Sequence, residues 1–570
     1  MSVELPAVAP TVTAELVAAL SPRLRKRLDA GIAKLADRPI VRDGDTVRIT
    51  VDDEGSELEL RTPEGVVTDA RAIRCGCLLA PDCLHRAAAA SAAPVADVSE
   101  TTGKPAPGSS APEAPAAASG ESAASAQHVA AQALFAAAAA VLDAGTDGSG
   151  AVLQAELLRA AHAARLAGLP RAATAAVSVV TALRAARAAD PAFRLTGLVA
   201  ALAETLYVGY RVPFATGPEL TGLRGTVRQP YAPDGSLRLY GLFSEPVLTA
   251  SGYAGAVTWT ADADGRLYTV SDVAPGGAGR AVGAADRAVR IGDTALTHRE
   301  LARAGLAVSG ATVSPTGRLG AGAGVRAVRA SGADWRAEPL DRLWAVPVAE
   351  QAGRALRGGH DLLFLEVTPA GVVREAAGDG LLADCGGVPL RLTAAHDHPA
   401  LPHRDNLRLL SAARGSRLRV IARLVPAPHA RAQLLAAEHP TIAGSRVDLG
   451  LDRLQHADLP APAPAIAVPT SEEAPVHLLR RRVEQAASGG RRVLAFPGNA
   501  TVDTRRLHGH GLATAGDILD ELLAAAADRS RDAFGRLLPA DTGRFARAWL
   551  SAARYADEVD RALCAAAWDG

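Results

Sequence analysis

The segment "RCGCLLAPDCLHRA", residues 74–87, decides how the amino-terminal part of this chain folds. It holds three of the five cysteines and one histidine as C-x-C, then five residues, then C-x-H. Zn²⁺ prefers four ligands in a tetrahedron, and three thiolates with one imidazole complete that shell. A complete shell leaves no open position for water, so the ion would be structural. The segment therefore predicts one zinc ion bound by Cys75, Cys77, Cys83 and His85.

Two other interpretations of these four residues stay open. They could be buried or unrelated side chains, or Cys75 and Cys77 could form a redox dithiol. The clustering of cysteine in a chain that otherwise hardly uses it favours the metal, provided that the compartment is reducing.

The sequence also predicts that compartment. The first twenty residues lack the basic stretch that precedes the apolar part of a secretory signal. The longest apolar run, residues 133–142, is shorter than the roughly 20 residues of a membrane-spanning helix. We therefore expect a soluble cytoplasmic protein with no membrane partner.

The flanks of the cysteine segment predict a small mixed fold. Residues 11–38 carry apolar side chains at helical spacing, with a break at Pro22. Apolar and polar residues alternate in "DTVRITV" and "SELELRT", which predicts two strands. A helix should begin near Asp82 or Cys83 and present Cys83 and His85 from its first turn, while Gly76 would let the first ligand pair turn tightly.

This arrangement resembles the SWIM-type zinc fingers, whose pattern is C-x-C, a variable gap and then C-x-H. The match covers residues 45–90. The resemblance implies a ββα fold, zinc ligation by the four residues named above, and binding of DNA or of proteins. The dense basic stretch near the finger is residues 23–27, whereas "VDDEGSELE" beside it is acidic, so DNA and protein both stay open as partners.

Length and composition predict several domains. The chain has 570 residues, of which 48% are hydrophobic, and its 61 basic and 61 acidic residues balance. We expect a multidomain α+β protein with a ββα zinc module, a helical bundle, a β-rich sandwich or barrel, and a helical end. The predicted segments are a SWIM-like module (1–91), a disordered Ala/Pro/Ser linker (92–126), a helical bundle (127–215), a β-rich region with room for two subdomains (216–455), a Pro-rich linker (456–470) and an α-rich end (471–570).

The β-rich region carries three further hypotheses. Gly235, Gly265 and Gly371 fall where hairpin turns need a positive φ. A similarity between residues 235–246 and 415–426 could mark a duplicated unit or arise by chance. A barrel of the OB type could bind single-stranded nucleic acid through aromatic side chains, although alternation favours placing them in the core; they are Tyr231, Tyr240, Phe243, Tyr253, Trp259 and Tyr268.

No catalytic motif is evident in the sequence: the P-loop, S-x-x-K, HExxH and G-x-S-x-G patterns do not occur. The best candidate for a second metal is the segment with His396, His398 and His403, though its prolines suggest an ordinary surface loop. His508 and His510 also fit an ordinary loop. The remaining cysteines, Cys385 and Cys564, fit small buried residues better than nucleophiles.

The function that these patterns favour is binding, with zinc fixing a recognition surface for a protein or for DNA. The alternatives are an enzyme of unknown chemistry in the β-rich region, using the histidines around His398, or a scaffold in a multiprotein assembly. The basic stretch at residues 480–482 should face solvent from a helix, and together with Arg491 and Arg492 it could dock an acidic partner.

Overall fold

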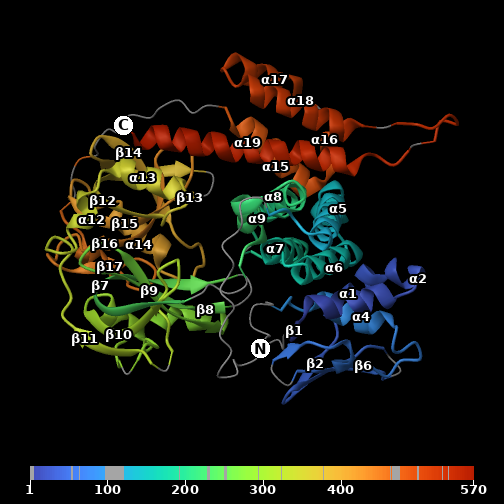
Figure 1. Cartoon of the computed structure of the whole chain (residues 1–570), viewed down its shortest axis with the longest axis horizontal. Helices are drawn as coiled ribbons and strands as arrows, with labels where there is room; N and C mark the ends of the chain where they lie inside the picture. The colour runs from blue at the N-terminus through green and yellow to red at the C-terminus, as the bar shows by residue number, and fades with distance from the viewer. Residues whose placement is uncertain are drawn as a thin grey trace. The chain divides into compact units, whose positions relative to one another are not determined.

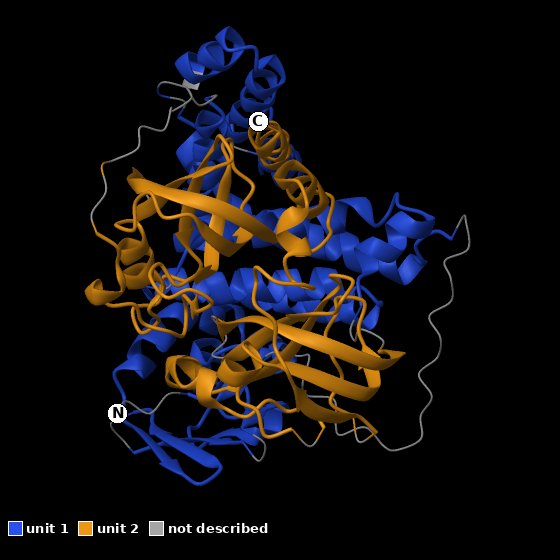
Figure 2. Cartoon of the chain, turned by 90° about the vertical axis from the view of Figure 1, so that its left-hand side faces the viewer, with its two compact units in different colours: residues 1–227, 475–556 blue, residues 228–474, 557–570 orange. Residues whose placement is uncertain are grey.

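The protein is a multidomain α+β structure, as predicted, with 44% helix and 25% strand. The chain divides into two compact units (Figure 2): unit 1 comprises Met1–Val227 and Pro475–Ala556, and unit 2 comprises Arg228–Ala474 and Asp557–Gly570. This computed structural model describes residues 5–52, 55–62, 65–96, 121–191, 193–226, 231–249, 253–292, 294–322, 324–375, 378–461, 464, 475–496, 498, 500–528, 530–536 and 538–569.

Unit 1 begins with an antiparallel four-stranded sheet in the order β2-β3-β4-β6. Val47, Leu58 and Ile73 of successive strands point into one core, because alternate side chains of a strand face the same side. Figure 1 shows helices on one side of this sheet. The elements of this part are β1 (Ala7–Val8), α1 (Pro10–Ala19), α2 (Pro22–Arg25), α3 (Leu28–Ala36), β2 (Ile40–Asp43), β3 (Thr46–Thr50), β4 (Glu57–Arg61), β5 (Val66–Val67), β6 (Ile73–Cys75) and α4 (Leu84–Ala92).

The structure confirms several local predictions here and adds four short strands, β1, β2, β5 and β6. The helical segment is interrupted before Pro22, as expected, and again before α3. The two predicted strands correspond to β3 and β4. The edge strands β2 and β6 were not predicted, because "IVRD" and "IRC" are too short to show a clear alternation.

In the rest of unit 1 the described residues form mainly helices. Its helices are α5 (Ser125–Gly148), α6 (Ala151–Leu166), α7 (Pro170–Arg187), α8 (Leu195–Arg211), α9 (Gly217–Arg224), α15 (His477–Gly489), α16 (Arg491–Leu494), α17 (Ala500–Gly509), α18 (Ala513–Ala527) and the first part of α19 (Thr542–Trp568). The last turns of α19 belong to unit 2, where Cys564 and Trp568 join a buried cluster.

Helix α5 (Ser125–Gly148) extends beyond the apolar run at residues 133–142, which was too short to predict a membrane-spanning helix. Within the described ranges it passes, by length and composition, as a candidate membrane span, and 44% of its apolar window is buried inside the structure. The length of the apolar run is smaller than the length of the helix because small and polar residues continue the helix on both sides of the run.

Glycines allow α5 and α15 to touch backbone to backbone. Gly145 and Gly490 both have positive φ, at 70° and 75°. A Cβ on Gly145 would lie 2.3 Å from the amide nitrogen of Gly490, which no real side chain tolerates. Only glycine fits this crossing.

Unit 2 contains two β structures. The first is a five-stranded antiparallel sheet in the order β11-β10-β7-β8-β9. Its elements are β7 (Ala232–Leu248), β8 (Tyr253–Ala261), β9 (Leu267–Pro275), α10 (Gly277–Val282), α11 (His298–Leu301), β10 (Gly305–Val313) and β11 (Arg326–Ala330).

The second β structure closes into a barrel. Its order is β14-β13-β12-β15-β16-β17, and β14 also pairs in parallel with β16, so five strands form a ring. With α14 between the third and fourth strands, this is the topology of an OB-type Greek-key barrel. The elements are α12 (Arg342–Ala345), α13 (Val348–Leu356), β12 (Leu362–Glu375), β13 (Gly378–Cys385), β14 (Val388–Ala394), α14 (His403–Leu410), β15 (Leu418–Leu424), β16 (Arg431–Glu438) and β17 (Arg446–Asp448).

The two β structures share one strand order but not the similarity seen in the sequence. In each, a three-strand meander is followed by helix, a fourth strand beside the first and a fifth beside the fourth. Residues 235–246 lie in β7 and residues 415–426 contain β15, which are first and fourth strands respectively. The sequence similarity therefore does not join equivalent strands.

Of the three predicted hairpin glycines, one lies in a turn between strands. Gly265 has a φ of 85° between β8 and β9. Gly235 and Gly371 also have positive φ, but each lies inside a long strand next to a shift in the pairing register. These two predictions are corrected to β-bulges, which bend a long strand so that it can pair on both sides.

The two compact units neither confirm nor contradict the predicted division into six segments, which stays a prediction. Of the linker at 92–126, residues 97–120 lie outside the described residues, and so do most of residues 462–470.

Candidate metal centre

The four predicted ligands lie where a strand and a helix approach each other. Cys75 ends β6, and Cys77 follows two residues later. Cys83 is the N-cap residue of α4, and His85 lies in its first turn, as predicted. The strand brings one pair of donors and the helix start brings the other.

The expected role of Gly76 is corrected. Its φ is not in the left-handed region, and an added Cβ would meet the backbone of Glu57 only at an ordinary 3.7 Å. Its amide nitrogen donates to the Glu57 carbonyl at 2.9 Å, which continues the ladder between β4 and β6. The first ligand pair is therefore placed by strand pairing and does not need a glycine.

The donor atoms converge on one point. One ligand atom from each of the four residues lies within 4.8 Å of the others. The Cys75 Sγ atom is 3.7 Å from His85 Nδ1. Zinc bond lengths of about 2.3 Å to sulfur and 2.0 Å to nitrogen give tetrahedral edges of roughly 3.5–3.8 Å. The group could therefore hold a metal ion, and its sulfur-rich donor set is the kind that zinc prefers.

A hydrogen bond between Cys75 and Cys83 shifts the pKa values of both thiols. Cys83 is buried at 2% exposure, and a hydrogen bond from Cys75 lowers its pKa to about 5. The same hydrogen bond raises the pKa of Cys75, because ionising it would remove the donor. The hydrogen-bonded pair therefore favours the thiolate on Cys83 and the thiol on Cys75.

Sequence reasoning missed the residue that holds this centre together. Arg86 is 7% exposed, and its guanidinium donates to three carbonyl oxygens. These belong to Ile73 on β6, to Pro81 in the loop between the ligand pairs, and to Ala70 before the strand. A planar guanidinium can satisfy several carbonyls at once. No sequence signal marked it, because arginine is the common cation of this chain.

The histidine segment of the β-rich region is not assembled as a metal site. His396 uses both ring nitrogens, one at 3.3 Å from the Leu248 carbonyl and one accepting from the His398 amide at 3.0 Å. His403 starts α14 and is 2% exposed. Within the part of the chain that the structure describes, the cluster of Cys75 is the one group of three or more such ligands.

The other candidate residues also have ordinary surroundings. Cys385 is buried, and burial raises its pKa to about 12, which opposes the thiolate that a nucleophile needs. His510 contacts the Arg506 carbonyl at 2.8 Å, and His508 lies 3.6 Å from an Asp517 oxygen. Phe243 and Tyr268 are buried, and Phe243 stacks on Trp259, so these aromatic side chains fill cores.

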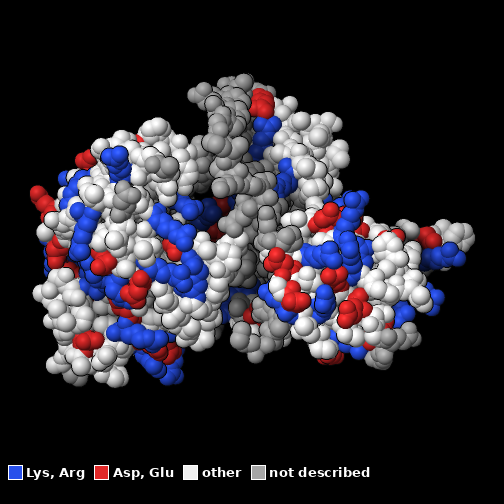
Figure 3. Space-filling view, turned by 90° about the horizontal axis from the view of Figure 1, so that it is seen from below, with Lys and Arg blue, Asp and Glu red and all other residues white. Residues whose placement is uncertain are grey.

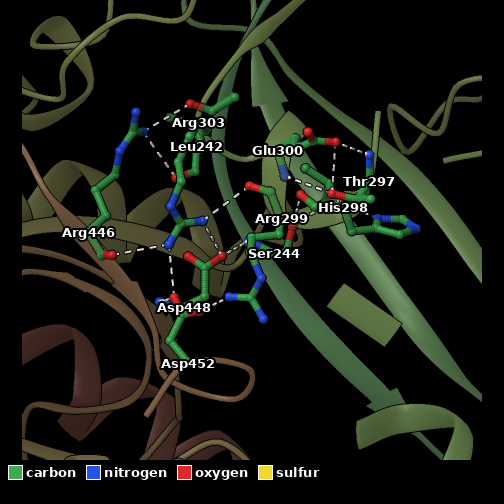
Figure 4. A network of polar contacts seen from close by, with 12 residues as sticks. Leu242, Ser244, Thr297, His298, Arg299, Glu300, Arg303, Arg446, Asp448 and Asp452 are labelled. Carbon is green, nitrogen blue, oxygen red and sulfur yellow. Dashed lines mark hydrogen bonds and ion pairs between the residues drawn. The ribbon is translucent and has the colours of Figure 1, made fainter. Parts of the chain in front are cut away.

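A polar network that the sequence did not reveal lies within unit 2 (Figure 4). Asp448, the last residue of β17, accepts from Arg303 at 3.1 Å and from the Ser244 amide on β7. Arg303 also pairs with Asp452 at 2.8 Å. Because β7 and β17 belong to different β structures, these bonds join the two. The buried charges are paired, which is typical of a structural contact.

No family model, curated protein or solved structure matches the chain.

Proposed function

We propose that residues 1–91 form a zinc-stabilised module of the SWIM type, which binds another protein in the cytoplasm. The observation that supports this is the convergence of four donor atoms from β6, the following loop and the start of α4. With three thiolates and one imidazole the ion has no free position, so its task is to fix the shape of the module.

Charge favours a protein partner over nucleic acid. Residues 1–91 carry 12 Lys and Arg against 14 Asp and Glu, a formal net charge of −2. On the outer face of the sheet, Arg48, Glu59 and Arg74 lie opposite one another on successive strands, so the sign alternates. Figure 3 shows basic and acidic side chains interspersed on the face of the molecule seen from below. A phosphate backbone needs a continuous basic surface.

Metal analysis of the full-length chain tests the zinc premise. We expect one zinc per chain after purification under reducing conditions. Cys75→Ser should lose the metal, because it leaves three ligands. Cys564→Ala removes a buried cysteine outside the cluster and should keep it. Equal metal content in the two variants, or none in the parent, would refute the premise.

Retention on a DNA column distinguishes the two partner classes. A DNA-binding module would be retained at low salt and released steeply as salt rises. We expect no salt-dependent retention. Retention that disappears in Cys75→Ser would instead make DNA the partner.

A further inference from the structure

The loop between the two ligand pairs displays two adjacent leucines to solvent. Leu78 is 102% exposed and Leu79 is 63% exposed, and the next two residues, Ala80 and Pro81, are exposed as well. Two large aliphatic side chains at one loop contribute nothing to the core of their own module. Their transfer from water to an apolar surface would be favourable in proportion to the area buried.

The loop is held at both ends. Near its start the Ala80 amide donates to the Cys77 carbonyl at 3.1 Å, and near its end Arg86 donates to the Pro81 carbonyl. A metal on Cys77 and Cys83 would clamp the same five residues a second time. A fixed loop loses little conformational entropy on binding, so its apolar side chains are efficient anchors.

We infer that Leu78 and Leu79 are the anchor that inserts into an apolar groove of the partner protein. This inference rests on the proposed function and names the surface that performs it. Charges of both signs flank the leucines in the sequence, with Arg74 before them and Asp82 after them. An apolar centre with a mixed polar rim is the composition of protein interfaces. Anionic lipid and nucleic acid would need a basic rim.

Site-specific photocrosslinking in the full-length protein identifies what touches the loop. A benzophenone side chain replaces Leu78 in one sample. In the matched control it replaces Leu166, which is 76% exposed at the end of α6. Both are irradiated in lysate of the native host, and a protein that crosslinks at position 78 but not at position 166 is then purified.

Calorimetry with the purified partner measures the contribution of the leucines. We expect the double variant Leu78→Ser/Leu79→Ser to bind about 100-fold more weakly than the parent, because each buried leucine is worth about one factor of ten. Its zinc content should be unchanged, and Leu166→Ser should bind like the parent.

Three results would overturn the inference: equal crosslinking at positions 78 and 166, equal affinity of the double variant and the parent, or leucine-dependent binding to phosphatidylcholine vesicles in place of a protein. A parent chain that lacks zinc but shows the full leucine effect would contradict the proposed zinc role and support the anchor. The two failures are therefore distinguishable.

Discussion

Arg86 shows how the metal centre depends on a residue that is not a ligand. Its guanidinium spans the segment before β6, the strand itself and the ligand loop through three carbonyl oxygens. Each carbonyl is part of a segment that places a ligand. Without the arginine, these acceptors would lose their donors in a largely buried place, which costs free energy.

We predict that Arg86→Lys destabilises the full-length protein by about 2 kcal/mol, since an ammonium cannot reproduce the planar fork of donors. Urea unfolding followed by circular dichroism measures this. The control is Arg71→Lys, an exposed arginine nearby, which should change stability by less than about 0.5 kcal/mol. A lysine variant as stable as the Arg71 control would show that the clamp is unimportant.

His298 gives unit 2 a pH dependence. It is fully buried, its Nδ1 contacts Thr258 at 2.7 Å, and burial lowers its pKa to about 4. The unfolded chain takes up the proton first, so the contribution is complete above pH 6.5 and is lost as the pH falls toward 4. We expect a loss of roughly 3 kcal/mol over that interval.

Unfolding of the His298→Gln variant between pH 4 and pH 7 checks this expectation. Its stability should vary less with pH than that of the parent. The difference in slope should correspond to about one proton taken up on unfolding. His456→Gln alters an exposed histidine and should leave the parent profile intact. Parallel profiles for the parent and the His298 variant would contradict the assignment.

Among single residues, the sequence identified those whose type is rare in the chain. The four ligands stood out because cysteine occurs five times in 570 residues. Arg86, Asp448 and His298 did not stand out, because their importance comes from burial and from partners far along the chain.

At the scale of elements, the crossing of α5 and α15 is the most constrained contact of the helical part. Gly490 has a φ of 75°, and an added Cβ would lie 2.5 Å from the Asp143 carbonyl oxygen. Thr146 Oγ1 also donates to the Ser488 carbonyl at 2.8 Å across the same crossing. Both observations place two backbones in direct contact.

We predict that Gly490→Ala costs at least about 3 kcal/mol, from the strained φ and from the collision together. Gly511→Ala separates the two terms, because Gly511 has a φ of 76° with nothing within 4 Å of an added Cβ. That control should cost only about 1–2 kcal/mol. Thermal unfolding of both variants measures the difference, and equal costs would mean that the helices move apart freely.

Elements with a strong local signal were predicted, whereas short strands that form mainly by pairing with a neighbour, such as β2 and β6, were not. The start of α4 was found because it follows a ligand pair and opens an alanine-rich run. The segment "ALTHRELARAGL", residues 295–306, has the composition of a helix, yet α11 occupies only His298–Leu301 and β10 begins at Gly305. The sheet partners of β10 outweigh the helix propensity of the segment.

At the scale of the whole molecule, the group that could hold a metal ion and the closed barrel belong to different compact units. The ligand cluster belongs to unit 1, and the barrel of β12 to β16 belongs to unit 2. Barrel closure relies on the parallel pairing of β14 with β16, in which Arg391 lies opposite Arg431. Such closure joins distant residues and has no local sequence signal, which is why only "sandwich or barrel" could be predicted.

We predict that chelation loosens the module and leaves the barrel folded. After treatment with a strong chelator, hydrogen exchange should accelerate in β4, β6 and α4, because metal binding contributes folding free energy there. Exchange in β12 and β15 should stay as it was. Uniform acceleration along the chain, or none, would contradict a local structural role for the ion.

X-ray absorption at the zinc edge of the purified full-length protein tests the central claim most directly. We predict a first shell of three sulfur atoms at about 2.3 Å and one nitrogen at about 2.0 Å. In Cys83→Ser one sulfur should be lost from the shell or the metal should be absent. A parent spectrum with a shell of oxygen and nitrogen alone would contradict the assignment of Cys75, Cys77, Cys83 and His85 as the ligands.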